Sequence, residues 1–434
     1  MRTIRLFRSM SGPVQLLLVN QCGMALGFYL LVPYLATYLA NELEMAAAVV
    51  GAVLGIRTFA QQGLTIVGGA AADRFGCRPV IIAGCALRVV AFAIFAFSSS
   101  ALGLMSAAIL TGVAGALFSP AVRTYLALEA ADRRVDAFTL YSLTNTVGAL
   151  AGPLLGSVLI LAGFGPMALT SAIIFAFLTI AQALWLPSRP QKAPAGPVWA
   201  SWRQVATDRR FMVFTIACAG MLTLYNQFYL LLPLEAARVT GWAGATGAVF
   251  LISTMTTLLL QVRVTQVLKR RMTPYRAIIV GLLVAAVSFI AGACSATWLS
   301  NGGRNTAILV VLASSIPVAL ATGFLAIGLN IAQPFALDRA ADFARPGLTG
   351  TYLGLYASAG GLVAAGGNTV IGYLADVGQR GHLPALPWLA LALLAVLSAT
   401  AITATRPSDA REGPATENEG IAATGAETPT PART

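Results

Sequence analysis

Residues 68–79 read Gly68-Gly69-Ala70-Ala71-Ala72-Asp73-Arg74-Phe75-Gly76-Cys77-Arg78-Pro79, and they separate two long apolar runs, 45–72 and 80–97. So short a charged segment between such runs predicts a tight hairpin of two membrane helices at the water interface. We expect the glycines to let helix backbones approach closely, and Asp73 to accept hydrogen bonds from a helix N-terminus or from arginines. Arg74 and Arg78 indicate that this side is cytoplasmic. The simpler alternative is a hairpin that only obeys the preference for positive charge on the inside.

The composition indicates that lipid is the solvent of this chain. Of the 434 residues, 57% are hydrophobic and 10% are charged, whereas soluble domains are about a quarter charged. The net charge is +12, but the basic residues lie between apolar runs, so we interpret them as topology signals and lipid contacts and expect no nucleic-acid partner. Five cysteines without CxxC spacing and a single histidine predict neither a disulfide framework nor a metal site.

Apolar runs of membrane-spanning length recur along the whole chain. A helix needs about 20 residues to cross roughly 30 Å of hydrocarbon. This rule predicts an all-α membrane protein of twelve transmembrane helices in two six-helix halves, with spans at about 14–40, 46–71, 79–98, 103–126, 137–162, 166–187, 211–234, 243–268, 275–298, 305–335, 350–374 and 385–404. The expected parts are a basic tail (1–12), an N-terminal half (13–187), a cytoplasmic linker (188–210), a C-terminal half (211–404) and a disordered tail (405–434).

The positions of the basic residues support this topology. With the N-terminus in the cytoplasm, 21 of the 28 lysines and arginines fall in cytoplasmic tails and loops, and three fall in outer loops. The remaining four lie within or at the ends of spans: Arg57, Arg88, Arg123 and Arg263. This asymmetry predicts a multi-pass protein of the plasma or inner membrane with both termini in the cytoplasm.

The hairpin stretch resembles a signature of the major facilitator superfamily, GxxxDRxGxRP in the loop between spans two and three. Gly69, Asp73, Arg74, Gly76 and Arg78 stand at the family's spacing. The resemblance implies a major facilitator fold in which these residues form a gating motif. In such transporters two repeats enclose a binding site near the middle of the membrane.

A second motif lies in the fifth predicted span, where residues 148–156 read GALAGPLLG. Gly148, Gly152, Pro153 and Gly156 resemble the GxxxGPxxG motif of drug:proton antiporters. Its physical meaning is a close, glycine-lined helix contact with a bend at the proline. Ordinary tight packing of glycine-rich membrane helices is the alternative.

Further stretches narrow the resemblance to MdtH-type multidrug exporters of the drug:proton antiporter family. They are residues 55–63 running into 68–76, then 208–211, 232–233, 350–354 and Asp376. The resemblance implies a twelve-span exporter driven by proton entry.

Arg57 is the main candidate for substrate binding, because it lies near the middle of the second predicted span. A cation there costs roughly 2.5–3.5 kcal/mol on insertion scales, so it must face a cavity, a carbonyl or an acid. The other candidates are polar or aromatic groups of spans one, two and seven: Gln21, Tyr29, Gln61, Tyr225 and Asn226. Together they would suit a pocket for amphipathic compounds. Alternatively, Arg57 is a structural clamp and the tyrosines are interface anchors.

No acid occurs between Arg8 and Glu42, so the first span offers no carboxylate to carry a proton. The acids lie at the ends of spans. Asp73 and Glu129 are candidate partners of arginines in an inner gate, and Glu235 is a candidate that reaches into an outward cavity. Proton coupling is therefore implied by the resemblance only.

These observations predict a secondary active transporter that exports small amphipathic compounds or drugs by alternating access. A dedicated exporter or importer of one metabolite, such as a sugar, a siderophore or a self-made antibiotic, is the first alternative, and a membrane sensor without transport is the second. No GxxxxGK[ST], HExxH or GxSxG motif occurs, so neither ATP-driven pumping nor an enzyme is expected. We expect a monomer without cofactor or metal, whose partners are a small-molecule substrate, protons and the lipid bilayer.

Overall fold

The structure is a computed structural model that describes residues 2–130, 133–188, 203–298, 308–344 and 349–405. Within these ranges the chain forms helices and no strand. Most of the predicted linker and nearly all of the predicted C-terminal tail lie outside the described residues, so the expected domain boundaries stay a prediction.

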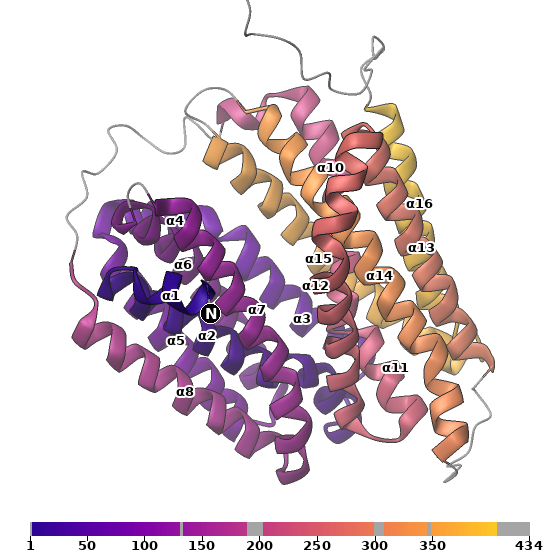
Figure 1. Ribbon diagram of the computed structural model, residues 1–434. Helices are drawn as coiled ribbons and strands as arrows, with labels where there is room; N and C mark the ends of the chain where they lie inside the picture. Colours follow the sequence, from indigo (N-terminus) through magenta and orange to yellow (C-terminus); the bar gives the residue numbers. More distant parts are fainter. Residues whose placement is uncertain (1, 131–132, 189–202, 299–307, 345–348, 406–434) are drawn as a thin grey trace, which may run out of the picture.

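The helices form two groups that lie side by side (Figure 1). The first group holds α1 (Arg2–Arg8), α2 (Gly12–Thr37), α3 (Ala47–Gly63), α4 (Thr65–Phe75), α5 (Cys77–Phe97), α6 (Ala101–Glu129), α7 (Arg134–Leu159) and α8 (Phe164–Trp185). The second holds α10 (Arg209–Tyr225), α11 (Leu231–Thr240), α12 (Thr246–Arg271), α13 (Pro274–Trp298), α14 (Ile308–Asp342), α15 (Thr349–Arg380) and α16 (Leu386–Ala404).

Nine helices in the described part of the chain are long and apolar enough to cross a membrane, and a shorter apolar helix covers Ala243–Leu259. The predicted spans at 46–71 and 350–374 are not among the nine. The total of twelve spans therefore stays a prediction, whereas the all-helical membrane fold is confirmed.

The second predicted span is wrong as one continuous helix, because it is divided into α3 and α4 at Leu64. The Thr65 hydroxyl donates to the carbonyl of Gln61 at 2.7 Å. Such a bond to the preceding turn bends helices, and Gly63 beside it weakens the helix further.

Local sequence explains where several helices begin and end. Gly76 separates α4 from α5 with φ of 86°, a backbone conformation that L side chains rarely adopt. Ser100 caps α6 by accepting from the backbone N–H of Gly103 at 3.1 Å. Asp208 caps α10 in the same way, accepting from Phe211 at 3.2 Å.

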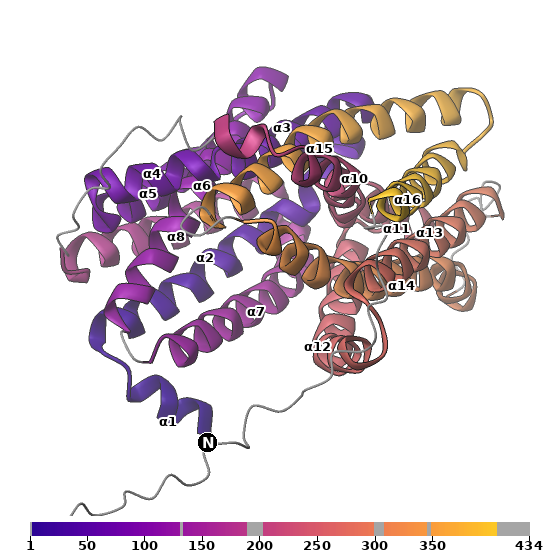
Figure 2. The ribbon, with the colours of Figure 1, turned by 90° about the horizontal axis from the view of Figure 1, so that it is seen from above.

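The two groups meet chiefly where α3 packs along α15, as both views show (Figures 1 and 2). A Cβ atom added at Gly51 or Gly55 of α3 would lie closer than 3.0 Å to the backbone of α15, and one added at Gly372 of α15 would meet the backbone of α3 equally closely. Small residues thus allow backbone-to-backbone packing between the groups, as expected in a membrane.

The helices run between two ends of the molecule. The linker end is where α4 and α8 end and α10 begins, and the far end is where α2 ends, α3 begins and α15 ends. At the far end α2, α7 and α12 also meet. The Tyr34 hydroxyl of α2 donates to the carbonyl of Pro153 in α7 at 2.5 Å, and Gly247 of α12 packs beside both.

The close approach expected at Gly69 is wrong, since a Cβ there would have no atom within 4 Å. Its neighbour Gly68 makes the contact instead. A Cβ at Gly68 would overlap the carbonyl oxygen of Ala116 in α6. The helix turns by about 100° per residue, so adjacent glycines face different surroundings.

Candidate functional site

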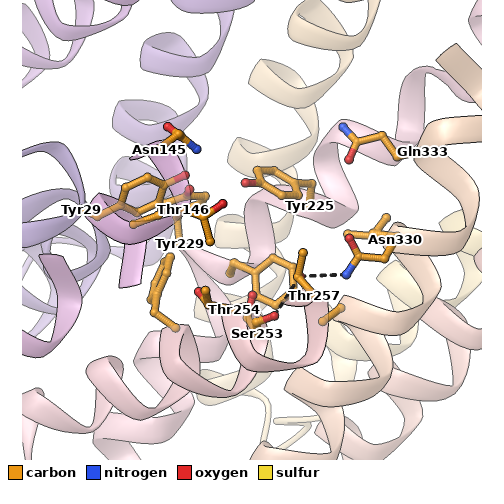
Figure 3. A pocket seen from close by; sticks show the side chains of 15 residues that line it. Tyr29, Asn145, Thr146, Tyr225, Tyr229, Ser253, Thr254, Thr257, Asn330 and Gln333 are labelled. Atoms are coloured by element: carbon orange, nitrogen blue, oxygen red, sulfur yellow. Dashed lines mark hydrogen bonds between the residues drawn. The ribbon is translucent and has the colours of Figure 1, made fainter. Parts of the chain in front are cut away.

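A cavity of about 230 Å³ lies between the two helix groups (Figure 3). The first group contributes residues of α2 and α7, namely Tyr29, Asn145, Thr146 and Ala149. The second contributes residues of α10, α12 and α14 and of the segment after α10, namely Tyr225, Phe228, Tyr229, Phe250, Ser253, Thr254, Thr257, Ala326, Leu329, Asn330 and Gln333. A compound bound in this central cavity would touch both groups.

Both aromatic rings and small polar groups line the central cavity. The ring centroid of Tyr229 lies 6.0 Å from that of Tyr225 and 5.3 Å from that of Phe250, while Tyr29 lies 6.2 Å from Phe250 across the two groups. Among the polar groups, the Asn330 amide donates to the Thr257 hydroxyl at 2.8 Å (Figure 3). Such a lining can stack on a flat apolar body and orient it with a few hydrogen bonds.

A smaller cavity of about 120 Å³ lies within the first group and shares Tyr29 and Asn145 with the central cavity. Gln21, Gln61 and Arg88 are among the residues that line it. The Gln21 amide donates to Asn145 at 2.8 Å, which ties α2 to α7 where the two cavities adjoin. Gln21, Tyr29 and Gln61 therefore lie at cavities, as expected.

Arg57 is buried, with 4% of its surface exposed, and lies between the two cavities without lining either. Its guanidinium donates to Gln61 Oε1 at 3.1 Å and to Thr58 Oγ1 at 3.2 Å. It also lies over the rings of Phe28 and Tyr229, 5.4 and 5.6 Å from their centroids. The residues that hold Arg57 are thus neutral, and they position it beside both cavities.

Asn226 does not reach either cavity, so its predicted contact with substrate has no support in the geometry. It is buried in a 3-10 turn (Asn226–Phe228) between α10 and α11, and its amide donates to Thr58 at 3.3 Å. The turn interrupts the candidate span Arg209–Thr240 near its middle, and Tyr225 and Tyr229, which flank the turn, line the cavity. Irregular backbone in the middle of a span is tolerated where protein or a cavity surrounds it.

The glycines of the second motif face α2. A Cβ at Gly148, Gly152 or Gly156 would lie closer than 3.0 Å to atoms of that helix. Pro153 lies inside α7, and its carbonyl accepts the Tyr34 hydrogen bond described above. The close contact is therefore present, and its role in antiport stays a prediction.

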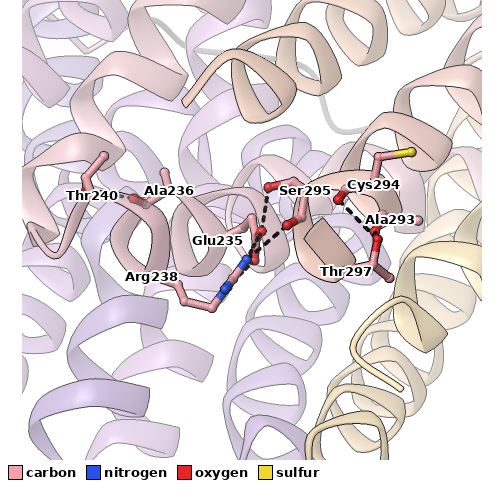
Figure 4. Close-up of polar contacts among 8 residues, drawn as sticks. All are labelled: Glu235, Ala236, Arg238, Thr240, Ala293, Cys294, Ser295 and Thr297. Atoms are coloured by element: carbon pink, nitrogen blue, oxygen red, sulfur yellow. Dashed lines mark hydrogen bonds and ion pairs between the residues drawn. The ribbon is translucent and has the colours of Figure 1, made fainter. Parts of the chain in front are cut away.

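A third cavity, of about 650 Å³, lies at the far end, between the π-helical turn after α2 (Tyr38–Glu42) and helices α3, α11, α13, α15 and α16. Glu235 lines it and is 7% exposed. Its carboxylate accepts from Arg238 at 2.6 and 2.8 Å and from the Ser295 hydroxyl at 2.7 Å (Figure 4). Glu235 therefore lies at a cavity, and the expectation that this cavity opens outward stays a prediction.

Asp376 of α15 makes a polar contact between the two groups at the same cavity. Its two carboxylate oxygens accept from the backbone N–H groups of Ala47 and Ala48, at 2.8 and 2.9 Å. These are the first N–H groups of α3, which lack partners within the helix. An acid of one group thus caps a helix of the other.

The residues of the charged hairpin are only partly described. The side chain of Asp73 lies outside the described residues, so its expected gating contact stays a prediction. Arg74 is exposed, and Arg78 donates to the carbonyl of Ala183 near the end of α8 at 2.7 Å rather than to an acid. Glu129, at the end of α6, accepts from the Ser11 hydroxyl at 3.2 Å.

Several cavity residues were not among the sequence candidates. They are polar side chains inside apolar runs, namely Asn145, Thr146, Ser253, Thr254, Thr257, Asn330, Gln333 and Arg88. That signal is visible in the sequence. It does not say whether such a side chain faces a cavity, a neighbouring helix or lipid, because that depends on how each helix is rotated.

Comparisons with known proteins agree with this architecture. The family model described as Major Facilitator Superfamily matches residues 17–368. An uncharacterized MFS-type transporter of Mycobacterium tuberculosis is 35% identical over 91% of this chain and 93% of its own. The multidrug resistance protein MdtH of Photorhabdus laumondii is 30% identical over 89% of this chain and 92% of its own.

Solved structures share the fold at low sequence identity. A crystal structure of a mutant of the nucleoside transporter NupG superposes with a TM-score of 0.76 at 15% identity, covering 91% of this chain and all of the other. A POT family transporter in complex with 5-aminolevulinic acid gives 0.74 at 14% identity, covering 90% and 95%. Together with the family match, these findings make the chain a membrane transporter and not an enzyme: it belongs to the Major Facilitator Superfamily.

Proposed function

We propose that this transporter is a secondary active exporter that moves small amphipathic compounds out of the cell in exchange for protons. The observation that carries the proposal is the central cavity, which both helix groups line with aromatic rings and small polar groups. Such a lining accepts flat apolar bodies of varied outline, which is what a multidrug exporter requires. The relatives named MdtH add support for the class of substrate.

Alternating access follows from how the groups touch. At the far end they are joined by Tyr34 with Pro153 and Gly247, by the α3–α15 contact and by Asp376 on α3. We infer that these contacts separate when the substrate leaves. The protein would lie in the bacterial inner membrane as a monomer, with both termini and the linker end in the cytoplasm.

The test is flux in proteoliposomes with an imposed pH gradient. The panel contains anionic, neutral and cationic aromatic compounds, and the expected result is transport that a protonophore abolishes. Tyr225→Ala should lower the flux, because it removes a ring from the central cavity. The matched control is Tyr373→Ala, which removes an exposed ring of α15. Absence of gradient-dependent flux for every compound would refute proton-coupled export.

A dedicated transporter of one metabolite is the second candidate. The polar lining of the cavity favours it, since Ser253, Thr254, Thr257 and Asn330 can make directional hydrogen bonds to one solute. Competition by a single compound class in the same assay, with no flux for the others, would select this candidate over a multidrug exporter.

A further inference from the structure

We propose that Arg57 and Arg88 together bind the carboxylate of an aromatic substrate, at the junction of the central cavity and the smaller one. The proposal rests on the transport function proposed above and deepens it by naming the substrate class. The pocket expected from the sequence would accept amphipathic compounds of any charge, whereas the site proposed here would select aromatic anions.

The first observation is an uncompensated pair of buried cations. Arg57 and Arg88 are 4% and 7% exposed, and their guanidinium carbons lie 5.4 and 5.2 Å from the centroid of the same ring, Phe28. No ion pair found among the described residues includes either of them. Like charges in a low-dielectric interior repel strongly, so the surroundings of Arg57 and Arg88 favour an anion.

The second observation is the state of their hydrogen bonds. Among the residues that the structure describes, Arg57 donates to the neutral acceptors Gln61 and Thr58 alone, and Arg88 to the carbonyl of Met24 alone, at the long distance of 3.5 Å. The Nε of each arginine is buried without a partner. A guanidinium offers five N–H donors in a planar fork, so both retain free donors in the geometry that matches a carboxylate.

The aromatic neighbours do not replace this missing acceptor. Arg57 lies over Phe28 and Tyr229, and Arg88 over Phe28 and Phe175 at 5.5 Å. A ring face attracts the charge of a cation, but it leaves the N–H groups in the guanidinium plane unbonded. The rings therefore make the buried cations tolerable and leave their donors available.

The third observation is access from the central cavity. Arg88 lines the smaller cavity with Gln21 and Gln61, and this cavity shares Tyr29 and Asn145 with the central one. A ring stacked among the tyrosines of the central cavity (Figure 3) would lie beside Tyr29 and Asn145. A carboxylate attached to it on that side would enter the smaller cavity, where Arg88 and Gln61, the partner of Arg57, lie. The aromatic body and the anionic group would then each occupy a cavity suited to it.

The experiment compares two ligands that differ in charge alone, 2-naphthoate and 2-naphthamide. Their binding to the purified full-length protein is measured by titration calorimetry, independently of transport. We expect 2-naphthoate to bind at least about tenfold more tightly. Arg57→Gln and Arg88→Gln should each weaken 2-naphthoate by about ten- to a hundredfold, the value of a hydrogen bond to a charged group, and leave 2-naphthamide unchanged.

Two further variants keep the result interpretable if the glutamine substitutions impair folding. Arg88→Lys retains the cation and should preserve the preference for 2-naphthoate at reduced affinity, because lysine lacks the fork. Arg276→Gln removes an exposed arginine of α13 and should change nothing. Thermal unfolding of each variant is measured alongside.

Equal binding of the acid and the amide, or binding of neither, would overturn the proposal, as would unchanged 2-naphthoate affinity in folded Arg57→Gln and Arg88→Gln. A titration with sulfate tests whether an inorganic anion binds as well as an aromatic carboxylate. Sulfate that binds as tightly as 2-naphthoate would also overturn the proposal. The transport function fails separately: selective binding of 2-naphthoate without flux in proteoliposomes would support the site and refute the exporter. Flux of amides and cations with no preference for acids would support the exporter and refute the carboxylate site.

Discussion

Buried or partly buried charges in this transporter are accommodated in three ways. Arg57 and Arg88 lie against aromatic rings, Glu235 is paired with Arg238, and Asp376 caps the N-terminus of a helix. Only the last two satisfy the charge with an opposite charge or a helix end. Among these charges, only Asp376 makes a contact between the two helix groups.

Replacing Asp376 by alanine should loosen the far end. The cap on α3 is lost, which costs about 1 kcal/mol of stability, and a polar contact between the two helix groups disappears with it. A cysteine replacing Leu231, which lines the far-end cavity, should then react faster with a membrane-impermeant maleimide. Asp376→Asn keeps one acceptor oxygen, so its labelling rate should be intermediate. Asp342→Ala, at the other end of the molecule, should leave the labelling rate unchanged. Unchanged labelling in Asp376→Ala would show that the cap does not hold this end closed.

Glu235→Gln should separate coupling from transport if Glu235 carries the proton. The neutral variant retains acceptors for Arg238 and Ser295 but no longer titrates, so flux driven by a pH gradient should be lost while exchange of labelled for unlabelled substrate continues. Loss of both activities with a normal unfolding temperature would assign Glu235 to binding or closure. Full gradient-driven flux would exclude it as the proton carrier.

At the scale of helices, the interface between α3 and α15 depends on which face each glycine occupies. Gly372 and Gly366 both lie in α15, six residues apart, yet a Cβ at Gly372 would overlap the backbone of α3 at Ala47 and one at Gly366 would meet nothing within 4 Å. Gly372→Ala should therefore force the helices apart and cost about 1–3 kcal/mol. Gly366→Ala should be neutral or stabilise by up to about 1 kcal/mol, because alanine favours the helix. Thermal unfolding of the two variants in the same detergent checks this, and equal shifts would contradict the packing.

The sequence predicts the helices better than their breaks. Apolar length places helices in each predicted span, and Gly76 marks the turn between α4 and α5. The breaks at Leu64 and at Asn226–Phe228 lie inside predicted spans, beside polar residues and Gly63. Such residues also occur in unbroken helices, so the bend depends on hydrogen bonds and neighbours that only the folded chain supplies.

The sequence likewise predicts only part of the candidate site. Tyr29 and Tyr225 could be chosen from their type and depth, and both line the central cavity. The sequence does not identify Arg88 and Asn330 as cavity residues, because their position depends on helix rotation and on which helices of the other group face them. Asn226 has the right type and depth but points to Thr58, so chemistry alone cannot separate a ligand-binding amide from a structural one.

At the scale of the whole molecule, a central cavity is enclosed by two helix groups whose far ends are in contact. Gly51 and Gly372 in the α3–α15 interface, the packing of Gly247 of α12 against Tyr34 and Pro153, and the Asp376 cap all join the groups at that end. Because packed interfaces switch between discrete arrangements rather than deform continuously, a transport cycle should separate these contacts together while the linker ends approach.

Distances between spin labels across the two groups test this motion most directly. One pair replaces Asn41 and Gln379 at the far end, and a second replaces Leu128 and Met272 at the linker end, all of them exposed positions, in a background without the five native cysteines. Measured in nanodiscs over an acid-to-alkaline titration, the far-end distance should lengthen as the linker-end distance shortens, in the same fraction of molecules. Two distances that stay fixed, or that lengthen and shorten together, would contradict alternating access about the central cavity.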